Sequence, residues 1–181
     1  MDSGKELENI VLRCKGGDKE SFEKLFELYQ PRLKYYIRRL DNTNTGAEDI
    51  LQDIWITVFR KIHKLKDNQS FTVWLYRIAR NEVYGRLRHG EKFVKLPEDE
   101  SHPHYSDEKN EFSAEDAERL HKALSKIQPY HREVLTLSFI EQMSYQQIAE
   151  VVGCSIGTVR SRIFYAKQSL RKEMERENGR L

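Results

Sequence analysis

The sequence of 181 residues has little of the chemistry found in secreted, metal-binding or membrane-spanning proteins. Its two cysteines, Cys14 and Cys154, form no CxxC pair, which argues against a disulfide framework or a zinc site and fits a reducing cytoplasm. No stretch approaches the roughly 18 apolar residues that span a bilayer. The first residues lack the basic and apolar segments of a signal peptide. We therefore expect a cytoplasmic protein.

The sequence also lacks the short motifs of common enzymes. It contains no Gly-rich phosphate loop, no nucleophile elbow and no HExxH zinc motif. Its six histidines are scattered, and the pair His102 and His104 is more simply incidental than metal-binding. We expect no catalytic residue, metal, cofactor or small-molecule substrate.

Strand-like alternation of useful length is missing, and apolar residues recur at helical spacing instead. One such stripe runs through Ile50, Ile54, Val58 and Ile62. A polar loop over residues 64–70 should precede another helix over about residues 71–88. The pattern predicts an all-α protein.

Glycine, proline and capping residues mark where the first helices should begin and end. Gly16 and Gly17 should end the first helix, and Asp18 is a good N-cap for the second. Pro31 should mark a break or a first-turn position, because proline cannot donate a helix hydrogen bond.

An acidic segment divides the chain. Residues 97–118 hold nine acids and one base, with few large apolar side chains. Such a composition is typical of a flexible linker. We therefore predict two small helical domains, residues 1–94 and 116–181, joined by a flexible acidic linker over residues 95–115.

Residues 144–163 favour a DNA-binding helix-turn-helix in the second domain. Ser144 can cap a first helix, and Ala149 is small where two helices would cross. Gly153 suits the left-handed residue that ends that helix, and Ser155 can cap the next. Two helices joined by a short turn with glycine form this motif.

Charge supports nucleic-acid binding by this second helix. Residues 155–172 hold five bases and no acid, which favours a polyanionic partner. With Ile156, Val159 and Ile163 turned inward, Arg160, Ser161 and Phe164 would face outward. The alternative is an ordinary solvated helical hairpin.

The first domain separates its charges by helix. Residues 41–59 carry four acids and no base, whereas residues 71–95 carry six bases and two acids. The pattern indicates a protein partner on the acidic helix and nucleic acid on the basic, aromatic-bearing one. Trp74 is more simply a core residue, and the arginines could instead form a solvated face.

Four segments together resemble the extracytoplasmic-function (ECF) sigma factors of bacteria. Residues 17–26 (GDKESFEKLF) are similar to the family's opening helices. Residues 47–55 (AEDILQDIW) resemble the segment that binds the clamp helices of the largest subunit of RNA polymerase. Residues 71–81 (FTVWLYRIARN) resemble the helix that meets the −10 promoter element, and residues 143–170 the helix-turn-helix that reads the −35 element.

The resemblance implies three sets of contact residues. Core polymerase would be bound by Asp49, Gln52 and Asp53. The −10 element would be bound by Lys66, Asp67, Asn68, Gln69, Trp74, Arg77, Arg80 and Asn81. The −35 element would be bound, within the helix-turn-helix of residues 144–165 and just beyond it, by Ser155, Thr158, Arg160, Ser161, Arg162, Phe164, Tyr165 and Lys167. It also implies contact with the flap of the second-largest polymerase subunit and an anti-sigma factor.

The sequence departs from the family pattern at the end of the basic helix and in the last helix. Where the family has an aspartate and two arginines, this chain has Gly85, Arg88 and His89. A helical glycine costs about 1 kcal/mol relative to alanine, so we expect this helix to end or bend early. Tyr165 replaces a frequent base and predicts a different −35 preference. The competing hypothesis is a stand-alone helix-turn-helix regulator.

Overall fold

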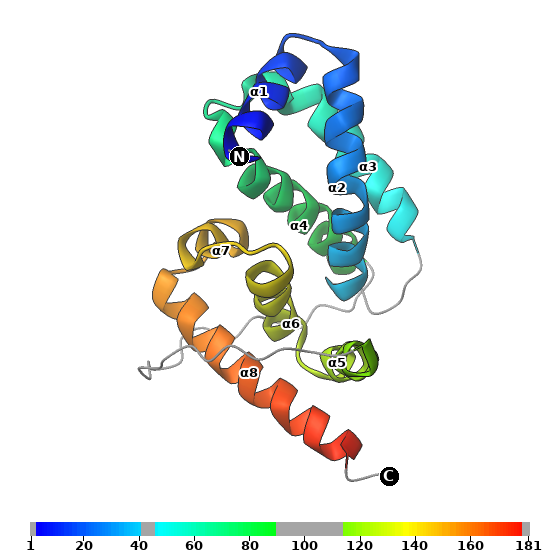
Figure 1. Cartoon of the computed structure of the whole chain (residues 1–181), viewed down its shortest axis with the longest axis vertical. Helices are drawn as coiled ribbons and strands as arrows, with labels where there is room; N and C mark the ends of the chain where they lie inside the picture. The colour runs from blue at the N-terminus through cyan, green and yellow to red at the C-terminus, as the bar shows by residue number, and fades with distance from the viewer. Residues whose placement is uncertain (1–2, 41–45, 90–113, 179–181) are drawn as a thin grey trace. The chain divides into compact units, whose positions relative to one another are not determined.

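The computed structural model describes residues 3–40, 46–89 and 114–178, and these are helical with no strand among them. They form two compact units, one built mostly from residues up to Phe93 and one mostly from the residues after it. Helices α1–α4 belong to the first unit, and α5, α6, α8 and most of α7 belong to the second (Figure 1). No helix in the described ranges is long and apolar enough to cross a membrane. The all-α class is confirmed; the linker predicted over residues 95–115 lies almost wholly outside the described residues.

The first unit consists of four helices and two short 3₁₀ turns. Its elements are α1 (Ser3–Lys15), α2 (Lys19–Leu40), α3 (Ala47–Lys61), η1 (Ile62–Lys64), η2 (Asn68–Ser70) and α4 (Phe71–His89). As predicted, α1 ends before Gly17, whose φ is 87°, and Asp18 caps α2 by accepting the backbone N–H groups of Glu20 and Ser21. The Asp18 carboxylate accepts the Ser21 hydroxyl at 2.6 Å, which is the main reason why its pKa lies below the usual value.

The core of the first unit forms where α2, α3 and α4 meet. The predicted stripe Ile50, Ile54, Val58 and Ile62 is buried along its whole length. The basic helix α4 is held by aromatic contacts, because its Tyr76 ring meets the Tyr36 ring of α2 edge-on at 5.1 Å. Tertiary packing on α2 therefore fixes which face of α4 is buried, and the opposite face of α4 is exposed.

Two expectations about this unit are wrong. Pro31 does not break or begin a helix; it lies inside α2 on an exposed face, where the unpaired carbonyl one turn earlier can meet water. Helix α4 does not end at Gly85 but continues to His89, close to the end predicted at about residue 88. Arg86, directly after Gly85, forms ion pairs with two acids, and these contacts offset part of the cost of the glycine.

The second unit packs a long C-terminal helix against shorter ones. Its elements are α5 (Ala114–Lys126), α6 (Pro129–Leu135), η3 (Thr136–Ile140, a π-helical turn), α7 (Tyr145–Val152) and α8 (Ile156–Asn178). Val134, Leu137, Ile148 and Val159 are fully buried in its core. Pro129 occupies the first turn of α6, where its missing N–H costs nothing.

Candidate interfaces for nucleic acid and a protein partner

Helices α7 and α8 are joined by the turn that the sequence predicts. Ser144 caps α7 in a reciprocal box, because its hydroxyl oxygen accepts the Gln147 N–H at 3.2 Å and the Gln147 side chain accepts the Ser144 N–H at 2.9 Å. Gly153 ends the helix with φ 72° and ψ 40°. The two helices thus form a helix-turn-helix whose geometry is set by local capping.

Ser155 and Thr158 form the N-terminal cap of α8. The Ser155 hydroxyl oxygen accepts the Thr158 N–H at 3.0 Å, and the two hydroxyl groups lie 2.9 Å apart. The predicted cap is therefore confirmed. Two of the side chains expected at the −35 element are already hydrogen-bonded to each other within the helix-turn-helix.

The expected inner and outer faces of α8 are wrong at two positions. Ile156, expected inside, is 42% exposed because it is the first residue of the helix, beyond the packed part. Ser161, expected outside, is only 3% exposed. Its hydroxyl donates to the Gly157 carbonyl at 3.2 Å, which satisfies the polar group inside the unit. Val159 and Ile163 are buried as expected.

The basic side chains of α8 differ in their surroundings. Arg160 and Lys167 are exposed, and the Lys167 ammonium lies 5.4 Å from the Phe139 ring centre. Arg162 is half-buried, with its guanidinium 5.9 Å from the Tyr130 ring centre. Phe164 and Tyr165 are half-buried and meet edge-on at 5.2 Å. Arg160 is thus the most accessible basic residue in the first two turns.

His131 lies close to Arg162 at the base of this surface. Burial, together with the positive charge of Arg162, lowers the pKa of the His131 imidazole to about 4. The ring is therefore neutral at physiological pH and contributes no positive charge to the surface.

Helix α4 presents a basic and aromatic face. Arg77 and Asn81 are exposed, whereas Arg80 is half-buried with its guanidinium 4.5 Å from the Tyr84 ring centre. Trp74, interpreted as a core residue, is only half-buried, 6.0 Å from the Phe71 ring. Four of the residues expected at the −10 element therefore lie on one helix, two of them freely accessible.

The loop before α4 is anchored at both ends and shaped by its own side chains. Leu65 and Phe71 are buried on either side of it. The Asp67 carboxylate accepts the Ser70 hydroxyl and the Gln69 N–H, and these bonds hold the Asp67 pKa below its usual value. Lys66 points into solvent. Asp67 therefore acts as a cap within the described structure.

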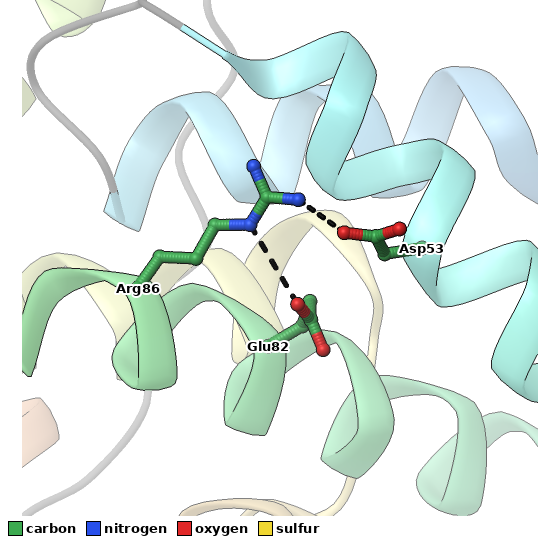
Figure 2. Close-up of polar contacts among 3 residues, drawn as sticks. All are labelled: Asp53, Glu82 and Arg86. Carbon is green, nitrogen blue, oxygen red and sulfur yellow. Dashed lines mark hydrogen bonds and ion pairs between the residues drawn. The ribbon is translucent and has the colours of Figure 1, made fainter. Parts of the chain in front are cut away.

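The acidic residues of α3 are partly engaged with cations of neighbouring helices. Asp49 and Gln52 are exposed. Figure 2 shows that Asp53 forms an ion pair with Arg86 of α4. The Arg86 Nε atom also lies 3.6 Å from a carboxylate oxygen of Glu82. Glu48 forms an ion pair with Lys34 of α2. The three residues expected at the polymerase therefore share one helix, and Asp53 is tied to α4.

Apolar side chains that the sequence argument did not single out extend this acidic surface. Ile56 is 40% exposed and Phe59 is 68% exposed, although both lie on α3. Phe59 meets the Phe22 ring of α2 at 5.3 Å. The helical spacing of Gln52, Ile56 and Phe59 could have revealed them, but an apolar residue on a helix is usually assigned to the core.

Comparisons with known proteins agree with this two-unit architecture. Residues 25–93 match the model for Sigma-70 region 2, and residues 117–170 match the model for Sigma-70, region 4. The region 2 match contains the acidic α3 face and the α4 face, and the region 4 match contains the helix-turn-helix.

Full-length relatives show the same similarity. The RNA polymerase sigma-H factor of Pseudomonas aeruginosa is 30% identical, over 93% of this chain and 93% of its own. The ECF RNA polymerase sigma factor SigW of Bacillus subtilis is 27% identical, over 93% of this chain and 96% of its own. The solved sigma factor RpoE of Bartonella quintana, in complex with the anti-sigma factor NepR, has a TM-score of 0.68 and 25% identity, over 86% of this chain and 98% of its own. The chain belongs to the ECF sigma factors, alternative sigma factors that direct transcription initiation by RNA polymerase.

Proposed function

We propose that this sigma factor divides its work among three faces. The α3 face binds core RNA polymerase, the loop with α4 binds the −10 element, and the start of α8 binds the −35 element. The observation that carries the proposal is the separation of charge, with exposed Asp49 on α3 and exposed arginines on α4 and α8. The chain would act in the cytoplasm as a specificity subunit with no catalytic residue of its own.

The polymerase-binding role of α3 is supported by an exposed carboxylate, Asp49, on the same helix as exposed apolar side chains. Within the described residues no cation pairs with Asp49, whereas Glu48 and Asp53 have Lys34 and Arg86. Among these residues, Asp49 therefore has no ion pair that must be broken before it meets a basic partner. Gln52, Ile56 and Phe59 supply amide and apolar contacts alongside.

The promoter-reading roles are supported by the type of side chain exposed. On α8, Arg160 lies near the N-terminus, the part of a recognition helix that meets base edges, and its fork matches guanine O6 and N7. Lys167 and Arg171 lie further along and suit phosphates, as does half-buried Arg162. On α4, exposed Asn81 suits base contact, and Arg77 suits a phosphate.

Two further partners are proposed. The exposed pair Phe139 (56%) and Ile140 (48%) in the second unit offers an apolar contact for the flap of the second-largest polymerase subunit. The relative RpoE of Bartonella quintana was solved with an anti-sigma factor. We therefore propose an anti-sigma partner for this chain as well.

Binding to core polymerase tests the α3 face. Asp49→Ala should weaken binding more than Asp53→Ala, because Asp53 is already neutralised in part by Arg86. Affinity for purified core polymerase would be measured by fluorescence anisotropy, with exposed Lys24→Ala in α2 as the control. Unchanged affinity of the Asp49→Ala, Asp53→Ala double variant would rule out this face.

Promoter choice tests the −10 loop. Residues 66–69 would be exchanged for those of the sigma-H relative, and transcription in vitro would be measured on a −10 library. A promoter base that leaves the duplex to meet the loop costs a few kcal/mol to extrude, and stacking and hydrogen bonds with the loop must return that cost. The exchange should change −10 preference and leave −35 preference alone; a fixed −10 preference would exclude the loop as the reader.

A further inference from the structure

Helix α1 lies before the residues that match Sigma-70 region 2, yet it contacts the loop proposed to read the −10 element. The Lys15 ammonium at the end of α1 donates to Asn68 Oδ1 at 2.9 Å, in a partly buried hydrogen bond across 53 residues of sequence. A helix that precedes the matched family segment therefore holds the Asn68 side chain of the loop.

A second contact joins the same two elements. Gln69 Nε2 donates to the Glu8 carboxylate of α1 at 3.5 Å. Glu8 and Lys15 lie two turns apart on α1, and they meet neighbouring amide side chains of the loop. An acid and a base on one helix thus each engage one of two adjacent amides.

The charge of each α1 residue decides which end of the amide it binds. An ammonium group can only donate hydrogen bonds, so Lys15 must meet the Asn68 oxygen, and the Asn68 NH₂ is left to face away. A carboxylate can only accept, so Glu8 must meet the Gln69 NH₂ and leaves the Gln69 oxygen available. The loop consequently offers a donor at residue 68 and an acceptor at residue 69.

We propose that α1 sets the hydrogen-bonding polarity of the −10 loop, with Lys15 as the principal positioning residue. The ligand is a promoter base that presents an acceptor to Asn68. Without Lys15 the Asn68 amide can rotate and offer either its oxygen or its NH₂, so that discrimination between bases falls. This inference rests on the proposed role of the loop, and it adds residues outside the loop that determine its specificity.

The backbone of the loop has supports other than this contact, although the charge of Lys15 is also one of the causes that lower the pKa of Asp67. Asp67 fixes the turn through the Gln69 N–H and the Ser70 hydroxyl, and Leu65 and Phe71 anchor its ends. Removing Lys15 should therefore release the Asn68 side chain without unfolding the loop. This separation makes Lys15 a suitable position for a test of specificity.

The test compares two substitutions at residue 15 with a matched control. Lys15→Met keeps the length of the side chain and removes the charge, and Lys15→Glu replaces the donor with an acceptor. Lys24→Met removes an exposed lysine from α2 in the same unit. Each variant would be assembled with core polymerase and assayed by in vitro transcription on a library of −10 elements and a library of −35 elements.

Lys15→Met should reduce discrimination at one −10 position by roughly two- to tenfold, the range expected for one hydrogen bond. Lys15→Glu should shift preference at the same position towards bases that present a donor, because it turns the Asn68 oxygen outward. Preference at the −35 element should stay unchanged in both, and Lys24→Met should behave as wild type.

Three results would overturn the inference. If Lys15→Met lowers transcription equally on every −10 sequence, Lys15 has only a structural role. If exchange of residues 66–69 changes −10 preference while both Lys15 variants keep the wild-type preference, the loop reads DNA without help from α1, and the proposed function stands. If neither the exchange nor the Lys15 variants alter −10 preference, the inference fails together with the proposed role of the loop.

Discussion

Helices α4 and α8 are both proposed to meet promoter DNA, but the chain positions them by different means. The start of α8 is set by residues close in sequence, through the Ser144 cap, the left-handed Gly153 and the Ser155 cap. Helix α4 is set by distant residues, through Tyr36 and the ion pair between Arg86 and Asp53. Capping residues that are close in sequence can be recognised from the sequence alone, whereas contacts between distant residues require the structure.

The difference also determines which part of the molecule a substitution should affect. A change in a buried tertiary contact should destabilise the first unit as a whole, because α2, α3 and α4 share one core. A change in a cap should act on the second unit through a single turn. Both tryptophans, Trp55 and Trp74, lie in the first unit, so tryptophan fluorescence reports on that unit alone while helical circular dichroism reports on both.

The largest effect is expected from Ile54→Ala in the core of the first unit. Ile54 is fully buried, and truncation of such a side chain costs about 2–5 kcal/mol of unfolding free energy. Urea unfolding followed by tryptophan fluorescence should show the loss. Ile56→Ala on the same helix is the control, because Ile56 is 40% exposed and should cost much less. Equal losses would contradict the assignment of the core stripe.

The next effect concerns DNA binding by α8. Arg160→Ala should cost about 1–3 kcal/mol on the preferred −35 site and relax preference at one base pair. Lys167→Ala should weaken all sequences alike and reduce the salt dependence of binding by roughly one unit of slope. Binding of holoenzyme to a −35 library at two salt concentrations separates the two roles. A uniform loss in Arg160→Ala would show that Arg160 contacts phosphate and not a base.

A smaller effect is expected from Gly153→Ala, which tests the left-handed residue that ends α7. Nothing lies within 4 Å of a Cβ added at Gly153, so the cost comes from the backbone alone. A residue with a Cβ in the left-handed region costs about 1–2 kcal/mol. The loss of stability should lower the unfolding midpoint seen by circular dichroism, which reports on both units. The transition seen by tryptophan fluorescence, which reports on the first unit, should stay unchanged. A shift of the tryptophan transition would mean that the two units do not unfold independently.

The sequence predicted the local features of the fold well and the tertiary ones poorly. Capping at Ser144 and Ser155, the turn at Gly153 and the stripe through Ile54 could be predicted because each depends on residues within one or two turns. The burial of Ser161 could not, since it depends on which side of α8 the other helices of the second unit cover. The comparisons show the family of the chain, whereas the contact residues for polymerase and promoter DNA are predictions.

Exposed apolar residues and long-range polar contacts were missed for the same reason. Phe59 and Ile56 follow a helical pattern that also fits a buried stripe, and only packing shows which side of α3 is covered. The hydrogen bond between Lys15 and Asn68 joins residues 53 positions apart, and no sequence spacing indicates it. The family resemblance supplied the role of the loop but not the helix that holds it.

The smallest effect, and the sharpest comparison with Gly153, is expected from Gly85→Ala in α4. Here too nothing lies within 4 Å of an added Cβ, but Gly85 sits inside a helix and has no positive φ. The same substitution should therefore stabilise the first unit by roughly 0.5–1 kcal/mol, because alanine loses less backbone entropy on entering a helix. Tryptophan fluorescence during urea unfolding should show a higher midpoint with an unchanged slope. Since Arg86 already holds the end of α4 through Asp53, the gain should increase in the Arg86→Ala background, where the helix past Gly85 loses that support. An equal gain in both backgrounds would show that the glycine and the ion pair act independently on α4.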